Sequence, residues 1–214
     1  MPTMTDNTYH YLKDPAEIYA LSFETVRAEV NLSRFLEDQC DIAIRLVHAC
    51  GMPEIVDDLM FTDNAVSAGR AALTAGAPIL IDATMVGAGI IDRHLTNNPI
   101  ICTLNDEGVA DDAAAWGTTR SAAAIDRWQS RLDGAVVAIG NAPTALFRLL
   151  EVIAAGAPKP AVILGFPVGF VGAAESKQAL IENQWGVEFI ALQGRRGGSA
   201  MASAAVNALA AGLR

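Results

Sequence analysis

The hydrophobic positions in the middle and C-terminal parts of the chain fall into short continuous runs. Continuous apolar runs are typical of strands that are covered on both faces of a sheet. The segments between the runs have apolar residues at helical spacing instead. We therefore predict five strands, at residues 78–82, 99–104, 135–140, 161–166 and 188–192.

Alternation of strands and helices indicates a parallel sheet with right-handed crossovers. The expected fold class is α/β: a single-domain, doubly wound, parallel five-stranded sheet flanked by helices. Three helices are predicted before the first strand, at about 15–30, 37–50 and 63–75. The others are predicted at 106–116, 119–132, 143–155 and 173–183, and from 199 to the end.

Helix start and stop signals support the first three helices. Asp14 is a good N-cap, Pro15 suits the first helical position, and Glu17 completes a capping box. Gly51 and Gly76 are suited to the left-handed conformation that ends a helix. There is no interdomain linker, so residues 1–214 are expected to form one domain, with a polar and mobile segment at 1–10.

The composition restricts the partners of this chain. Apolar residues make up 52% and charged residues only 18%, which favours further buried surface and therefore a homodimer. The net charge of −9 argues against nucleic acid. We expect no membrane span and no signal peptide, and therefore a cytoplasmic protein. Cys40, Cys50 and Cys102 lack metal-ligand spacing and are expected to be buried structural thiols.

Glycine-bearing loops follow three successive predicted strands, at 140–144, 165–177 and 194–199. Ligands of parallel sheets bind beyond the carboxyl ends of the strands, and each loop leads into a helix whose free N–H groups favour anions. The basic side chains of these loops are either solvated surface charges or a rim that binds a polycarboxylate. The candidate binding residues of the loops are Gly140, Asn141, Gly169, Gly172, Lys177, Arg195 and Arg196.

Two further residues are candidates for chemistry. His48 lies in the last turn of its predicted helix, between Val47 and Ala49. It is either a packed core histidine or a proton donor, and a helix C-terminus stabilises an imidazolium. Arg120 falls in the first turn of another helix, where a cation opposes the helix dipole. It is either a surface charge or a ligand contact.

Several common site motifs are absent from the sequence. There is no P-loop, no dinucleotide-binding fingerprint, no nucleophile elbow, and no histidine–cysteine–acid cluster for a metal. A reaction that needs neither cofactor nor metal fits these absences.

Seven motifs carry a resemblance to a known family. The chain resembles the precorrin-8X methylmutase (precorrin isomerase) family of cobalamin biosynthesis from about residue 11 to residue 213. The motifs are RLVHACGM at 45–52, GRAALTAG at 69–76, IICTL at 100–104, TTRSAAA at 118–124, IGNAPTALFR at 139–148, GFPVGFVGAAESK at 165–177 and GRRGGSAM at 194–201.

The resemblance implies a flavodoxin-like sheet and a homodimer with active sites near the subunit interface. It implies an isomerase without a cofactor that moves a methyl group of precorrin-8x from C-11 to C-12, giving hydrogenobyrinic acid. The family's catalytic histidine falls on His48 and its substrate-contacting arginine on Arg120, and Ser22 joins the substrate-binding set. The glycine loops would then receive the carboxylates of the substrate.

The sequence departs from the family at one position and leaves two alternatives. Many relatives have threonine where this chain has Ile91, so no binding role is assigned to Ile91. The first alternative is a methylmutase that acts on the cobalt-containing precursor. The second is a corrinoid carrier without catalytic activity, against which the retained His48 argues.

Overall fold

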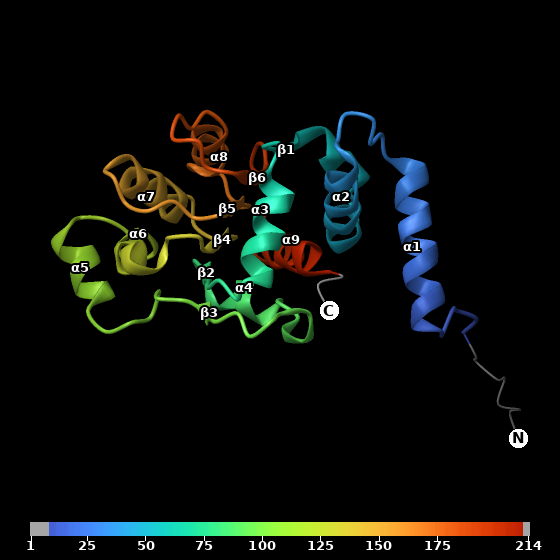
Figure 1. Ribbon diagram of the computed structural model, residues 1–214, viewed down its shortest axis with the longest axis horizontal. Helices are drawn as coiled ribbons and strands as arrows, with labels where there is room; N and C mark the ends of the chain where they lie inside the picture. The colour runs from blue at the N-terminus through green and yellow to red at the C-terminus, as the bar shows by residue number, and fades with distance from the viewer. Residues whose placement is uncertain (1–8, 212–214) are drawn as a thin grey trace, which may run out of the picture.

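The protein is described by a computed structural model that covers residues 9–211. Its centre is one six-stranded sheet with the order β1-β6-β5-β4-β2-β3 (Figure 1). Strand β1 pairs antiparallel with β6, and all other neighbouring strands are parallel. The strands are β1 (Leu59–Phe61), β2 (Ile79–Ile81), β3 (Ile100–Ile101), β4 (Val136–Ile139), β5 (Val162–Gly165) and β6 (Phe189–Leu192).

All five predicted strands are present, and their spatial order is that of flavodoxin-like folds. The sheet has one strand more than predicted. Residues 59–61 follow a 3₁₀ turn, Pro53–Asp58, and form the antiparallel edge. The apolar run at 59–61 is only three residues long, between Asp58 and Thr62, and is shorter than the run of four or more that indicates a buried strand, so the pattern gave no signal for β1.

The side chains of the strands point alternately to two helical layers. Val136 and Ala138 of β4 face one hydrophobic cluster, and Val137 and Ile139 face the other. Helices α2, α3 and α9 cover the first face, and α6, α7 and α8 cover the second (Figure 1). The helices are α1 (Pro15–Glu29), α2 (Glu37–Cys50), α3 (Ala65–Thr74), α4 (Thr84–Ala88), α5 (Val109–Ala115), α6 (Arg120–Ile125), α7 (Pro143–Ala154), α8 (Ala173–Ile181) and α9 (Ser199–Ala210).

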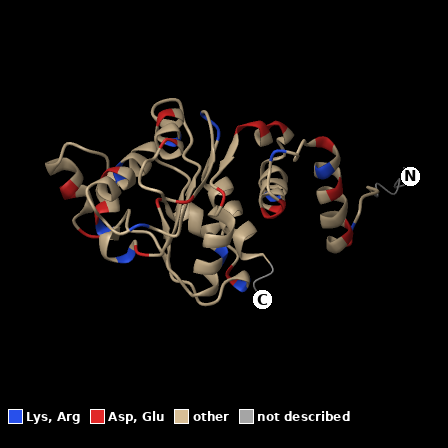
Figure 2. Cartoon of the chain, turned by 45° about the horizontal axis from the view of Figure 1, so that its top comes forward, with Lys and Arg blue, Asp and Glu red and all other residues tan. Residues whose placement is uncertain are grey.

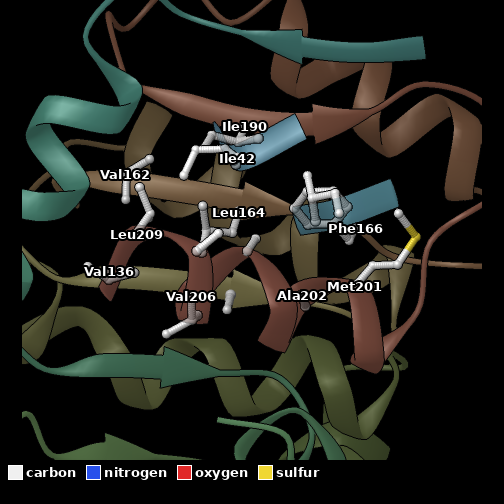
Figure 3. Close-up of a cluster of buried hydrophobic side chains, with 14 of the residues drawn as sticks. Ile42, Val136, Val162, Leu164, Phe166, Ile190, Met201, Ala202, Val206 and Leu209 are labelled. Atoms are coloured by element: carbon white, nitrogen blue, oxygen red, sulfur yellow. The ribbon is translucent and has the colours of Figure 1, made fainter. Parts of the chain in front are cut away.

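Helix α9 packs directly on the strands, as Figure 3 shows. Its residues Val206 and Leu209 are completely buried against the sheet. Two glycines allow the close approach: a Cβ on Gly69 would lie 2.7 Å from Leu209, and one on Gly140 would lie 2.8 Å from the Cα of Ser199. Real Cβ atoms do not come so close, so glycine at position 140 is what allows the start of α9 to pack against this loop.

The helix signals agree with the structure at most ends. The Asp14 carboxylate accepts a hydrogen bond from the Glu17 N–H at 2.9 Å, and Gly51 ends α2 with φ of 67°. The predicted helix at 119–132 is α-helical only to Ile125 and then continues as a 3₁₀ helix, Asp126–Arg131. This tighter turn places Trp128 in the core, where its indole N–H donates to the Thr103 hydroxyl at 2.9 Å.

Helix α1 lies outermost and contributes only Val26 to the buried core (Figure 1). Of the polar N-terminal segment predicted at 1–10, residues 1–8 lie outside the described part of the chain. No helix between residues 9 and 211 has the length and hydrophobicity needed to cross a membrane.

Candidate active site

His48 is exposed at the end of α2 and is not a core histidine. Its Nδ1 atom lies 2.7 Å from the hydroxyl oxygen of Ser22, which α1 supplies. Whichever atom carries the proton of this hydrogen bond, the other ring nitrogen, Nε2, remains available to a ligand. Ser22 therefore orients the imidazole, a role that is separate from the substrate contact predicted for it.

Aromatic rings on α1 enclose His48 on two sides. The Tyr19 ring centroid lies 5.5 Å from that of His48, and the Phe23 ring packs edge-on at 5.2 Å. Arg45, one helical turn before His48, places its guanidinium 5.2 Å from the centre of the Phe23 ring. Arg45 forms no ion pair with any residue in the described range, so its charge is available to an anion. The sequence analysis did not select Arg45, although the i, i+3 spacing puts it on the same helix face as His48.

Two adjoining cavities lie beside His48. The first, called the His48 cavity, has a volume of about 140 Å³. The second, called the α4–α9 cavity, has a volume of about 440 Å³ and is open to solvent. The His48 cavity is lined by Tyr19, Phe23, Arg45, His48, Ala49, Ile91, Ala204, Asn207 and Ala208. The α4–α9 cavity is lined by Ala49, Met85, Ala88, Gly89, Ala200, Ser203, Ala204 and Asn207.

The shared wall of the two cavities is α9, a helix without a charged residue. Charged side chains lie mainly on the outer helices and loops, whereas α9 carries none (Figure 2). Met85, at the edge of the α4–α9 cavity, is 71% exposed. An uncharged wall with a histidine and an unpaired arginine at one end suits a ligand with an apolar body and anionic groups.

Arg120 lies in a different part of the structure from His48. It is the first residue of α6, on the opposite face of the sheet from α2, and Thr119 caps that helix through the Ala122 N–H at 3.1 Å. Its guanidinium donates to the Asn105 side-chain oxygen at 2.6 Å. Arg120 lines neither the His48 cavity nor the α4–α9 cavity.

The first glycine loop already holds an anion, the carboxylate of Asp82. One oxygen accepts the Gly140 N–H at 2.8 Å, and the other accepts the N–H groups of Asn141 and Ala142 at 2.9 and 2.7 Å. Asp82 is 3% exposed and follows β2, next to β4, at the position where flavodoxin-like folds usually bind a ligand. Burial raises the pKa of Asp82, while the three N–H groups oppose this shift. The predicted N–H donors at Gly140 and Asn141 therefore have a partner within the chain.

The second and third glycine loops bind each other. The Gly169 N–H donates to the Arg195 carbonyl at 3.2 Å, and the Gly198 N–H donates to the Phe166 carbonyl at 2.8 Å. Gly172, with φ of 80°, begins α8. Arg195 is exposed, and its guanidinium lies 5.6 Å from the centre of the Phe170 ring. Of the basic residues predicted in these loops, Arg195 remains a free surface cation.

Lys177 and Arg196 are engaged within the protein. Arg196 forms ion pairs with Asp58 at 2.5 Å and with Glu54 at 3.2 Å. Lys177 is completely buried, and its ammonium donates to the Arg196 carbonyl at 2.5 Å. Lys177 thus anchors the third loop to α8 and is inaccessible to a substrate. The spacing within the motif gave no sign of this burial.

Lys177 should make stability depend on pH in the alkaline range. Burial, together with the charge of Arg196, lowers the pKa of Lys177 from 10.5 to about 8. Below pH 8 Lys177 is charged in both states, and the buried charge destabilises the folded state. Between pH 8 and 10.5 Lys177 is neutral in the folded state but still charged in the unfolded state, so the free energy of unfolding of wild type increases as pH rises. Relative to Lys177→Met, wild type should gain on the order of 3 kcal/mol across that range.

Urea unfolding of wild type and Lys177→Met at pH 7 and pH 10 would measure this change. Lys159 is the matched control, because it is exposed and also donates to a backbone carbonyl, that of Trp185. Lys159→Met should change the free energy of unfolding equally at both pH values. A Lys177→Met difference that is independent of pH would contradict the prediction.

Residues 9–211 contain no cluster of histidine, cysteine, aspartate and glutamate that is suited to a metal ion. A shallow hollow of about 470 Å³ lies over α8, but Glu175 and Glu182 line it. Those carboxylates would repel a polyanionic ligand, so the His48 cavity is the better candidate.

An α/β fold with an oriented histidine beside two open cavities is the arrangement of an enzyme that acts on a small molecule. Comparison with known proteins gives the family. A family model described as precorrin-8X methylmutase matches residues 17–211. The chain belongs to the precorrin-8X methylmutase family and is an isomerase of cobalamin biosynthesis.

Individual relatives cover nearly the whole chain. The precorrin-8X methylmutase of Pseudomonas aeruginosa is 57% identical over 201 residues, which are 94% of this chain and 97% of that protein. The cobalt-precorrin-8 methylmutase of Priestia megaterium is 36% identical, over 91% of this chain and 87% of that protein. A crystal structure of precorrin-8x methyl mutase from Thermus thermophilus has a TM-score of 0.82 and 39% identity, and it covers 91% of this chain and 94% of that one.

Proposed function

We propose that this protein moves a methyl group of precorrin-8x from C-11 to C-12, giving hydrogenobyrinic acid, and that His48 is the proton donor. The observation that carries the proposal is the geometry of His48 in a chain of this family. Its Nδ1 is held by Ser22 at 2.7 Å, and the residue lines a cavity that continues along the uncharged helix α9.

The reaction needs little covalent chemistry from the protein. A [1,5]-sigmatropic methyl shift breaks one carbon–carbon bond while it forms another, and the product contains the same atoms as the substrate. Donation of the Nε2 proton of His48 to a ring nitrogen withdraws electrons from the conjugated ring and lowers the barrier. The proton returns to Nε2 after the shift, so His48 ends the cycle as it began.

The carboxylates of the substrate require cations that are not already paired. Arg45 meets this requirement beside His48, and Arg195 does so at the third glycine loop. A guanidinium binds a carboxylate through two parallel hydrogen bonds. Arg120 remains a proposed substrate contact, because its present partners, the Asn105 side chain and the Leu104 carbonyl, are both neutral.

The separation of Arg120 from His48 favours an active site near a subunit interface. The cavity at His48 is small compared with a corrin macrocycle, and apolar side chains around it face solvent, including Tyr19 at 54% and Met85 at 71% exposure. A second copy of the chain would cover these side chains and enlarge the site. We therefore propose a homodimer.

The homodimer is tested by its mass. Light scattering at micromolar concentration should give about twice the chain mass of 22.5 kDa. The low content of charged residues, 18%, and the exposed apolar side chains near His48 are the physical reasons for this expectation. A mass near 22.5 kDa across the concentration range would contradict it.

The cobalt-free substrate is proposed because two relatives named for it are 57% identical to this chain, whereas relatives named for the cobalt form are 32–40% identical. The experiment is to incubate the protein with precorrin-8x and, separately, with cobalt-precorrin-8, and to follow both absorption spectra. Faster conversion of precorrin-8x supports the proposal. Conversion of the cobalt form alone would favour the first alternative. Binding of precorrin-8x without conversion of either form would favour a carrier.

A further inference from the structure

Asn207 is the one large polar side chain that α9 contributes to both cavities, and each end of its amide makes one hydrogen bond to the backbone of another segment. Its side-chain oxygen accepts the N–H of Ile91 at 2.8 Å. Its side-chain nitrogen donates to the carbonyl of Gly89 at 2.8 Å. These two contacts fix the orientation of the amide, because a flipped amide would place its nitrogen against the Ile91 N–H and its oxygen against the Gly89 carbonyl.

Segment 89–91 is held against α9 at a second point. A Cβ added to Gly89 would lie 2.3 Å from the Ser203 hydroxyl oxygen, so this backbone lies directly on the helix. The segment then leads into the His48 cavity, of which the Ile91 side chain forms part of the wall. Ile90 is buried in the core within this segment, and the 3₁₀ turn that follows, Asp92–His94, contains no buried residue. The two hydrogen bonds of Asn207 are the polar contacts that hold the backbone on either side of Ile90 to α9.

We propose that Asn207 is a positioning residue of the methylmutase site: it fixes segment 89–91 on α9 and thereby places Ile91 in the wall of the His48 cavity. This inference rests on the proposed function. Asn207 takes no part in proton transfer, because both ends of its amide are bonded to the backbone. It acts on how the macrocycle sits beside His48, where a displacement of about 1 Å costs up to about 100-fold in rate.

The first test measures the contact without substrate. In Asn207→Leu, which has a similar size but no hydrogen-bonding group, the Ile91 amide should exchange its hydrogen faster by NMR, whereas the Trp185 amide should not change. Asn183 is the matched control, because its side-chain oxygen accepts the Trp185 N–H at 3.3 Å and its nitrogen donates to the Leu180 carbonyl at 2.8 Å. Asn183→Leu should show the reverse pattern.

The second test measures the consequence for the reaction. Asn207→Leu should lower kcat/KM for precorrin-8x about 10- to 100-fold, mainly through kcat, without a shift in the pH dependence of kcat. Asn183→Leu should leave kcat/KM per folded molecule unchanged. If Asn207→Leu does not fold, Asn207→Ser is measured in its place, because serine is already common in α9 but is too short to reach both backbone groups.

The outcomes separate the two proposals. Wild-type protein that does not convert precorrin-8x refutes the proposed function, whatever the variants do. If wild type converts the substrate and Asn207→Leu matches it in kcat/KM, the positioning role is overturned. Unchanged exchange of the Ile91 amide in the variant would overturn it as well, even without kinetic data.

Discussion

Replacing His48 by glutamine is expected to lower kcat for precorrin-8x by about 10²- to 10⁴-fold, the usual contribution of a positioned general acid. Glutamine retains a polar group near Ser22 but cannot deliver a proton from the Nε2 position. Because His48 is exposed, the substitution should change the free energy of unfolding by less than about 1 kcal/mol. Single-turnover absorbance spectroscopy would measure the rate, and a titration with hydrogenobyrinic acid would show that binding is retained.

His10 provides the control for this prediction. It is exposed and lies outside the two cavities beside His48. His10→Gln should therefore isomerise the substrate at the wild-type rate. A His48→Gln protein that retains the wild-type kcat would remove the proton-donor role, and the reaction would then depend on binding and orientation alone.

The sheet was predictable because its strands are buried on both faces and therefore appear as continuous apolar runs. The run at 162–165, between helices on either side, has no polar residue and is entirely buried. Strand β1 was missed because its apolar run is only three residues long, and its pairing partner, β6, lies about 130 positions later in the chain. Long-range pairing of this kind leaves no local pattern.

The candidate site was only partly accessible from the sequence. The histidine at the end of α2 could be placed because Gly51 ends that helix, but its exposure depends on how α1 packs beside α2. The N–H groups of the first glycine loop looked free because their partner, Asp82, lies 58 to 60 positions away. The sequence did contain a sign of this contact, since Asp82 directly follows a buried strand that lies beside the loop. The burial of Lys177 likewise depends on the third loop folding over α8.

Replacing Asp82 by alanine is expected to destabilise the fold by about 3 kcal/mol or more. The substitution leaves the N–H groups of Gly140, Asn141 and Ala142 without their acceptor, and an unsatisfied buried donor costs about 1–3 kcal/mol. It also removes the negative charge at the N-terminus of α7, where the helix dipole favours an anion. Burying a carboxylate without a cation beside it is itself unfavourable, so its removal offsets part of this loss. We therefore expect a value near the lower end of the range for three unsatisfied N–H groups.

Urea unfolding of wild type and Asp82→Ala would measure the loss, and added formate should restore part of it. The vacated space is lined by three N–H groups that already converge on two carboxylate oxygens, so a small carboxylate can occupy the same position. A chloride ion at equal ionic strength is a single sphere and cannot fill both oxygen positions. Asp133 is the control, because it is exposed and Asp133→Ala should change stability by less than about 0.5 kcal/mol. An Asp82→Ala protein as stable as wild type would show that water satisfies the three N–H groups equally well.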